Sequence, residues 1–220
     1  MTEFSSLPPS EQARQLANPD GQLGLEVAEW LNTNNRAANA AVIDQLEIQP
    51  SCRVLEIGFG NGRSVPDVLG RSTDVRYTGI DISATMLDEA MRFNAERVAA
   101  GHATFHLASA EKMPFADASF DRVFAIGVIH FWPDPVPSLV KVRRVIRPDS
   151  LAVMQAIDAR TTQQYARPEF GFHTRSVDDW TALFREAGFG SVDAQLTEVE
   201  GITPDGTTNK RYAICIAART

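Results

Sequence analysis

Hydrophobic and polar positions along the chain predict a helical N-terminal region and then strands and helices in turn. Apolar residues recur at helical spacing over residues 24–47, where the polar run NTNNR interrupts them. Short apolar runs predict strands at residues 53–57, 75–80, 103–108, 120–126 and 151–157. Helical patterns separate most of these runs, near residues 63–70, from Ser83 to about Ala100, and from Pro135 to about Ile146. Alternation of this kind predicts a parallel sheet.

The last third of the chain has a different pattern. Residues 158–175 show little periodicity and are typical of an active-site loop or a short lid helix. A helix is expected from the cap residue Ser176 to the stop at Gly188. Two β-rich runs, 190–199 and 211–218, flank the turn-forming GITPDGTTN and predict an antiparallel hairpin at one sheet edge. The expected fold is therefore three-layered α/β, with a mostly parallel seven-stranded sheet.

Composition restricts the classes of function. The 220 residues are 44% hydrophobic and 22% charged, which is typical of one large folded domain. The formal net charge of −7 disfavours a nucleic-acid partner bound through phosphate neutralisation. The one dense basic segment, KVRRVIR at 141–147, has apolar residues at helical spacing and is interpreted as a solvated helix face. The sequence carries no signal for an oligomeric state.

Cysteine usage and the lack of targeting signals limit the kinds of site and the cellular compartment that are expected. Cys52 and Cys215 stand alone, without His or Cys at metal-ligand spacing, so neither a metal site nor a disulfide is predicted. The N-terminus lacks a basic start followed by an apolar core, and no apolar run approaches the roughly 18 residues of a membrane span. We expect a cytoplasmic protein without a stable membrane anchor.

The stretch VLEIGFGNG, residues 54–62, places three glycines between the first strand and the next helix. Gly58, Gly60 and Gly62 allow the main chain to turn sharply and to approach a ligand closely. The following helix offers free amides at its N-terminus. This setting predicts a nucleotide-like ligand whose ribose hydroxyls are accepted by Asp81, at the end of the next strand.

The glycine spacing distinguishes between possible ligands. Dinucleotide-binding dehydrogenases use GxGxxG at this turn, and their last glycine falls here on Arg63. Glu56 precedes the turn, where an acid is unfavourable beside a pyrophosphate and favourable beside a cationic ligand. A nicotinamide-dependent oxidoreductase is accordingly the weaker alternative.

VLEIGFGNG resembles the first motif of the class I S-adenosylmethionine-dependent methyltransferases, particularly the small-molecule branch that includes ubiquinone and menaquinone biosynthesis enzymes. YTGIDISATMLDEA (77–90) resembles the second motif. AEKMPFADASFDRVF (110–124), VRRVIRPDSLAVM (142–154) and AGFGSVDA resemble later segments, so the resemblance extends from about residue 50 to the C-terminus. It implies a Rossmann-like domain over 50–220 behind an N-terminal helical extension or lid over 1–49. The implied activity is in-line transfer of the methyl group of S-adenosylmethionine to nitrogen, oxygen or carbon of a small molecule; a non-catalytic cofactor-binding domain is the alternative.

The resemblance also implies a set of cofactor-binding residues. These are Glu56, Gly58, Gly60, Gly62, Asp81, Ile82, Met86, Ser109, Ala110, Glu111, Ile126 and Gly127. Ile82 and Met86 would pack against the adenine faces, although ordinary core packing explains Met86 equally well. Ser109 stands where the family commonly has an acid near the adenine amino group, so adenine recognition is weaker or shared with Glu111. Asp149 and Ser150 replace a glycine pair of the family in a turn expected to be structural.

The acceptor site is less specified. His130 follows the fourth strand, at the edge where open α/β folds bind ligands, and is the candidate general base; a role in shaping the loop by backbone hydrogen bonding is the open alternative. Candidate substrate-binding residues, each with a structural role as the alternative, are Trp30, Asn34, Phe131, Trp132, Tyr165, Phe170 and His173. The acceptor itself is not identified.

Overall fold

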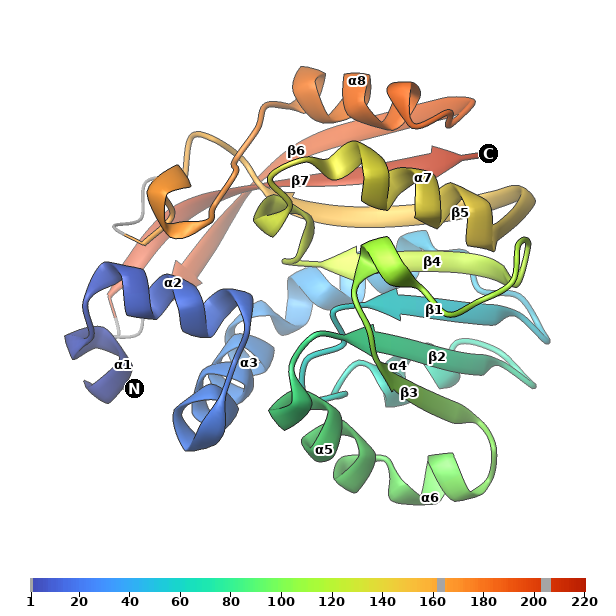
Figure 1. Cartoon of the computed structure of the whole chain (residues 1–220), viewed down its shortest axis with the longest axis horizontal. Helices are drawn as coiled ribbons and strands as arrows, with labels where there is room; N and C mark the ends of the chain where they lie inside the picture. Colours follow the sequence, from blue (N-terminus) through green and yellow to red (C-terminus); the bar gives the residue numbers. More distant parts are fainter. Residues whose placement is uncertain (1, 162–164, 203–206) are drawn as a thin grey trace.

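The computed structural model describes residues 2–161, 165–202 and 207–220. These residues form a seven-stranded sheet in the order β3-β2-β1-β4-β5-β7-β6 (Figure 1). The strands are β1 (Arg53–Ile57), β2 (Arg76–Asp81), β3 (Ala103–Leu107), β4 (Phe120–Ile126), β5 (Ile146–Ile157), β6 (Ser191–Ile202) and β7 (Thr208–Arg219). β1 to β5 run parallel, and β7 pairs antiparallel with β5 and β6. The predicted sheet and its edge hairpin are confirmed.

Helices precede the sheet and cover both of its faces (Figure 1). They are α1 (Thr2–Ser6), α2 (Pro9–Ala17), α3 (Gly21–Gln45), α4 (Val65–Leu69), α5 (Ala84–Phe93), α6 (Ala95–Ala99), α7 (Pro135–Val145) and α8 (Val177–Glu186), with 3₁₀ turns η1 (Ala110–Lys112), η2 (Ile129–Phe131) and η3 (Pro168–Phe170). In the described part of the chain, no helix combines the length and the apolar character that a membrane crossing requires.

The three layers follow from the alternation of side chains along the strands. In β4, Val123 and Ala125 pack into a core with Trp180 of α8. Phe124, between them, packs into a second core with Ile43 of α3. Because successive residues of a central strand are apolar on both sides, the sheet buries both faces, as a parallel sheet covered by helices requires.

The polar run at residues 32–36 does not interrupt α3, which continues over 25 residues. The predicted interruption is therefore wrong. Below the polar run, Val42 and Ile43 are buried against the sheet. The polar residues 32–36, which come earlier in the helix, line a cavity and so need not pack into the apolar core. α3 thus lines the cavity with its middle part and packs against the sheet with its last part. The division into an extension over 1–49 and a domain over 50–220 stays a prediction.

The long helix expected from Ser83 to Ala100 is divided into α5 and α6 at Asn94. The Asn94 side chain donates hydrogen bonds of 3.0 Å to the carbonyl oxygens of Gly62 and Ala90. Its backbone leaves helical geometry, with φ −105° and ψ 21°. A side-chain amide that competes for backbone groups breaks the helix here.

The C-terminal hairpin is longer than predicted. β6 and β7 extend beyond the β-rich runs at 190–199 and 211–218, so the expected turn at 201–209 is partly strand, and its residues 203–206 lie outside the described part. β5 likewise begins at Ile146, ahead of the predicted 151. Within it Asp149 has φ 58°, a left-handed conformation that aspartate tolerates better than most residues.

Strand order determines where a ligand binds. From β1 the chain moves outward to β2 and β3, whereas from β4 it moves the opposite way to β5. β1 and β4 are neighbours, so their carboxyl ends flank the point where the order reverses. Open α/β sheets bind ligands in the crevice at such a point.

Candidate active site

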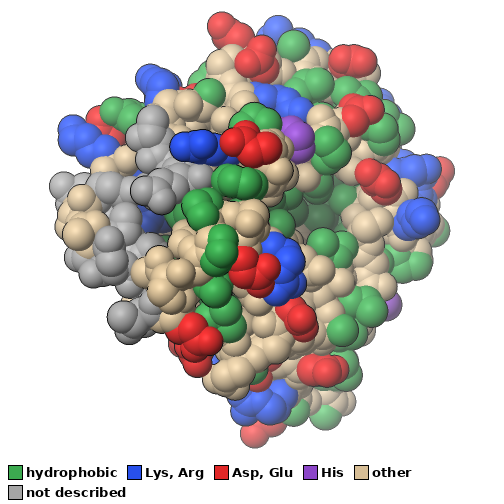
Figure 2. Space-filling model, turned by 60° about the vertical axis from the view of Figure 1, so that its left-hand side comes forward, with side chains coloured by type: hydrophobic (Ala, Val, Ile, Leu, Met, Phe, Trp, Pro, Cys, Tyr) green, Lys and Arg blue, Asp and Glu red, His purple; other side chains and the backbone are tan. Residues whose placement is uncertain are grey.

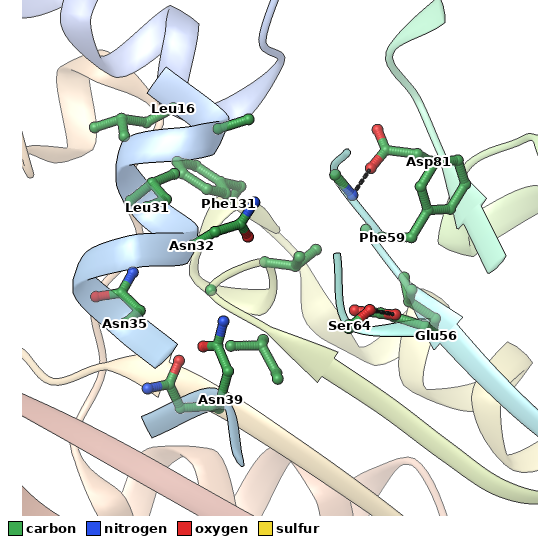
Figure 3. Close-up of a pocket in the computed structure, with 18 of the residues that line it drawn as sticks. Leu16, Leu31, Asn32, Asn35, Asn39, Glu56, Phe59, Ser64, Asp81 and Phe131 are labelled. Atoms are coloured by element: carbon green, nitrogen blue, oxygen red, sulfur yellow. Dashed lines mark hydrogen bonds between the residues drawn. The ribbon is translucent and has the colours of Figure 1, made fainter. Parts of the chain in front are cut away.

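A cavity of about 1420 Å³ opens at the carboxyl ends of β1, β2 and β4. The face shown in Figure 2 is hollowed near its centre, and hydrophobic side chains border the hollow. Figure 3 shows α3 on one side of the cavity and the turn after β1, with Asp81, on the other. Pockets for a single small ligand usually measure about 300–1,000 Å³, so this cavity has room for two ligands.

The glycines of the first turn have different surroundings. Gly58, Gly60 and Gly62 all have positive φ, between 55° and 75°. A Cβ on Gly58 would lie 2.3 Å from Cγ2 of Val128, whereas a Cβ on Gly60 would meet nothing within 4 Å. Gly58 therefore allows two loops to approach each other, and Gly60 leaves open space for a ligand.

Gly62 lies off the cavity wall, contrary to its expected place in the cofactor site. A Cβ on Gly62 would lie 2.8 Å from Cβ of Ala90. Its carbonyl oxygen accepts the Asn94 hydrogen bond. Gly62 thus packs the turn against α5.

Asp81 is fixed at the end of β2 by two backbone amides. Its Oδ2 accepts a 2.9 Å hydrogen bond from the amide of Gly60, drawn in Figure 3, and its Oδ1 accepts one of 2.9 Å from the amide of Ser83. Burial raises the pKa of the Asp81 carboxyl. Each oxygen retains acceptor capacity toward the cavity, so the carboxylate can hold a pair of vicinal hydroxyls.

Glu56 lines the cavity and belongs to a buried hydrogen-bonded group. Its Oε2 accepts from Ser64 Oγ at 2.5 Å and from the Tyr77 hydroxyl at 2.6 Å. Burial raises the pKa of the Glu56 carboxyl to about 7. Because both bonds go to one oxygen, Oε1 remains available to a cation. Ser64 and Tyr77 were not expected at the site.

The other cofactor-binding candidates also line the cavity. Ile82 exposes 54% of its surface there, an unusual exposure for a large apolar side chain beside a buried acid. Met86 is fully buried and its amide donates to the cap residue Ser83, so core packing also accounts for it. The remaining candidates that line the cavity are Ser109, Ala110, Glu111, Ile126 and Gly127.

His130 also lines the cavity, and only 2% of its surface is exposed. Its ring stacks on Phe172, with centroids 5.3 Å apart, and Nδ1 has no hydrogen-bond partner among the described residues. Burial lowers the pKa of the imidazole to about 3. The ring is therefore neutral near pH 7 and is a hydrogen-bonding group and a weak base. Its backbone oxygen accepts from the amide of His173 at 2.7 Å.

Glu56 and His130 are expected to affect stability with opposite dependence on pH. With a folded pKa of about 7 against a reference of 4.5, Glu56 stabilises the fold most at low pH, and this contribution is lost as the pH rises to 7. With a folded pKa of about 3 against 6.5, His130 contributes stability that is lost as the pH falls from 6.5 to 3. The two slopes oppose each other in the interval where they overlap.

The Glu56→Gln variant separates these contributions. Relative to the wild type, it should gain roughly 2 kcal/mol in free energy of unfolding between pH 5 and pH 8, because only the wild type loses the Glu56 contribution. Urea unfolding at both pH values measures the difference. An unchanged difference would contradict the raised pKa of Glu56.

The other wall of the cavity brings together most of the expected substrate residues. Trp30, Asn34, Phe131, Trp132 and Tyr165 line it, whereas Phe170 and His173 do not. Phe172, between those two, lines the cavity instead. Phe172, and not its neighbours, therefore faces the cavity. The sequence could not predict this choice, because residues 158–175 have no periodicity that assigns side chains to one face.

Besides Asn34, α3 lines the cavity with three asparagines that were not predicted from the sequence. Asn32, Asn35 and Asn39 recur at helical spacing and line the cavity, as Figure 3 shows. Asn32 Nδ2 donates to Asn61 Oδ1 at 2.6 Å, which joins α3 to the glycine turn. For Asn32 and Asn35 the available signal was the polar run NTNNR, which was interpreted as an interruption of the apolar helical pattern.

Comparisons with known proteins identify the family. Residues 55–154 match the family model described as a methyltransferase domain. The chain is 30% identical to the uncharacterized methyltransferase YdaC of Bacillus subtilis over 76% of this chain and 87% of that protein. It is 29% identical to the O-methyltransferase cnsE of Penicillium expansum, over 82% and 70% of the two chains. The protein belongs to the class I S-adenosylmethionine-dependent methyltransferases.

Solved structures agree on the fold. Phosphoethanolamine N-methyltransferase 2 of Haemonchus contortus, in complex with S-adenosyl-L-methionine, superposes with a TM-score of 0.76 at 14% identity, over 98% of this chain and 60% of that one. The cofactor of this family is S-adenosylmethionine, and the protein is accordingly a methyltransferase and not a nicotinamide-dependent oxidoreductase.

The residues present fit this cofactor. Open space beside Gly60 admits a ligand close to the backbone, Asp81 offers carboxylate oxygens, and the exposed Ile82 offers an apolar surface. When bound, S-adenosylmethionine supplies an electrophilic methyl group on a sulfonium centre. The chain contributes position, charge and exclusion of water around that group.

Proposed function

We propose that the protein methylates an acidic hydroxyl, that of a phenol or an enol, on a small-molecule acceptor. The cofactor is held by the residues of the glycine turn and by Asp81, and the acceptor lies between η2 and α3. The observation that carries the proposal is that the two walls of one cavity differ in charge: the acids other than Glu29 face the cofactor side, and aromatic side chains, asparagines and cations face the acceptor side. Among the described residues, the acids that line the cavity are Glu29, Glu56, Asp67, Asp81 and Glu111.

The position of these acids supports oxygen over an amine as the acceptor. Glu29 is paired with Arg63 at 3.2 Å. The other acids lie in β1 (Glu56), α4 (Asp67), at the end of β2 (Asp81) and in η1 (Glu111). On the acceptor side, α3 and the segment after β4 contribute aromatic side chains, asparagines and Arg36 to the lining, and β7 contributes Arg211. A cationic amine gains no opposite charge there, whereas an ionised phenol does. The relative cnsE is named an O-methyltransferase, which agrees with this choice.

His130 supports an acidic hydroxyl over an aliphatic alcohol. An imidazole with a pKa of about 3 accepts a hydrogen bond but is too weak a base to ionise an alcohol. A phenol, with a pKa near 10, ionises far more readily. We assign His130 to the acceptor hydroxyl, which it orients while the proton passes to water. Phe131, Trp132 and Tyr165 would enclose the ring of the acceptor.

Matched hydroxyl and amine acceptors test the proposal. With methyl-labelled S-adenosylmethionine, 2-naphthol should take up label at least about ten-fold faster than 2-naphthylamine, because only the hydroxyl ionises beside the cationic wall. His130→Asn should lower kcat and leave the affinity for S-adenosylhomocysteine unchanged. Faster labelling of the amine would contradict methylation at oxygen.

A further inference from the structure

Two asparagines on the cavity face of α3 carry unused hydrogen-bonding capacity. Asn35 and Asn39 lie one helical turn apart and both line the cavity (Figure 3). Among the described residues, neither side chain makes a hydrogen bond with another residue, and Oδ1 of Asn39 is buried without a partner. Buried amide oxygens are normally paired, so a ligand in the cavity can supply the partner that Oδ1 of Asn39 lacks among the described residues. Asn35 is half-buried and adds a second open amide one turn earlier on the same wall.

Their neighbours on the same helix already have partners. Asn32 donates to Asn61 Oδ1, and Asn34 Nδ2 donates to the carbonyl oxygen of Trp30 at 2.8 Å. Those two amides therefore serve the structure of α3 and its contact with the glycine turn. Asn35 and Asn39 make no such contacts within the described part of the protein. Asparagine is a poor helix former, so these two positions do not favour the helix either.

We infer that Asn35 and Asn39 bind oxygen substituents of the acceptor and select an oxygen-rich aromatic compound over a bare hydrocarbon ring. This inference rests on the proposed function. A side-chain amide presents a donor and an acceptor, and rotation about χ2 exchanges them, so one asparagine can bind a hydroxyl or a carbonyl. Two of them, one turn apart, read two substituents along one edge of a flat molecule.

The surrounding charges fit the same class of acceptor. Arg36 follows Asn35 on the cavity wall, and Arg211 lies over the Trp30 ring with its guanidinium carbon 6.0 Å from the centroid. Trp30, Phe131 and Phe172 offer aromatic surfaces on the same cavity. A polyphenol combines the flat ring, the several oxygens and the partial negative charge that these side chains favour.

Two ligands with one skeleton test the inference. Quercetin carries several hydroxyls on the flavone skeleton, and flavone carries none beyond the shared ring oxygen and ketone. Calorimetry in the presence of saturating S-adenosylhomocysteine should show that the wild type binds quercetin more tightly than flavone. Asn35→Ala and Asn39→Ala should each weaken quercetin binding by about 3- to 10-fold and flavone binding by less, because flavone offers only the ketone and the ring oxygen.

The controls separate this inference from the proposed function. Gln22→Ala removes an exposed amide from the same helix, outside the cavity, and should bind both compounds like the wild type. Alanine favours the helix, so the variants should fold, which circular dichroism checks. Unchanged quercetin affinity in both asparagine variants, or no preference of the wild type for quercetin, would overturn the inference. If the wild type did not bind S-adenosylhomocysteine at all, that result would instead refute the placement of the cofactor.

Discussion

Replacing Asp81 with alanine is expected to weaken binding of S-adenosylhomocysteine by about 100-fold or more. The carboxylate is held by the amides of Gly60 and Ser83 and faces the cavity. Hydrogen bonds to a charged group contribute about 1.5–3 kcal/mol each, so two bonds to ribose hydroxyls account for this loss. The variant also frees the Gly60 amide, which loosens the turn that the cofactor contacts. Calorimetric titration measures the change.

Two further variants identify the cause of that loss. Asp88→Ala removes an exposed acid from α5, outside the cavity, and should bind like the wild type. Asp81→Asn keeps the shape of the side chain but loses the charge and one acceptor. Its affinity for S-adenosylhomocysteine should therefore lie between that of the wild type and that of Asp81→Ala. An Asp81→Ala variant with wild-type affinity would mean that the cofactor does not use this carboxylate.

Replacing Gly58 with alanine is expected to lower the free energy of unfolding by about 2–5 kcal/mol. The residue has φ 75°, which costs an L-residue about 1–2 kcal/mol. The new Cβ would also lie 2.3 Å from Cγ2 of Val128, an overlap that costs about 1–3 kcal/mol in a packed site. Chemical denaturation followed by tryptophan fluorescence measures the loss.

The neighbouring glycine provides a matched comparison. Gly60→Ala meets no atom within 4 Å, so it should cost only the conformational part, about 1–2 kcal/mol, and should mainly impair cofactor binding. Adding Val128→Ala to Gly58→Ala should recover part of the stability, because it removes the overlapping methyl group. If both glycine variants lost the same stability and the double variant recovered none, the contact with Val128 would not explain the effect.

The sequence predicted the features that depend on local interactions. β4 was expected at residues 120–126 and lies there, because its buried apolar residues Val123, Phe124 and Ala125 are followed by the glycine at 127. The starts of α7 and α8 were predicted from their caps: Asp134 accepts from the Val136 amide and Ser176 from the Asp179 amide. The glycine turn and Asp81 could likewise be placed at one sheet edge, since both follow directly after strands.

Features that depend on distant partners could not be predicted. The break at Asn94 requires the carbonyl oxygen of Gly62, 32 residues away. The Glu56 group requires Tyr77 from the next strand, and nothing in the sequence indicates that the Tyr77 hydroxyl faces Glu56. Asn32, Asn35 and Asn39 can be recognised as site residues only once the fold places α3 across the cavity from the glycine turn. A polar face toward a cavity and a break in a helix have the same sequence pattern.

In the proposed arrangement, cofactor and acceptor occupy opposite walls of one cavity. The most direct test is a crystal structure of the protein with S-adenosylhomocysteine. We predict the ribose hydroxyls within hydrogen-bond distance of the Asp81 carboxylate, the adenine against Ile82, and free space between the thioether sulfur and the pair Asn35 and Asn39. S-adenosylhomocysteine bound without contact to Asp81, or extending over those asparagines, would contradict this arrangement.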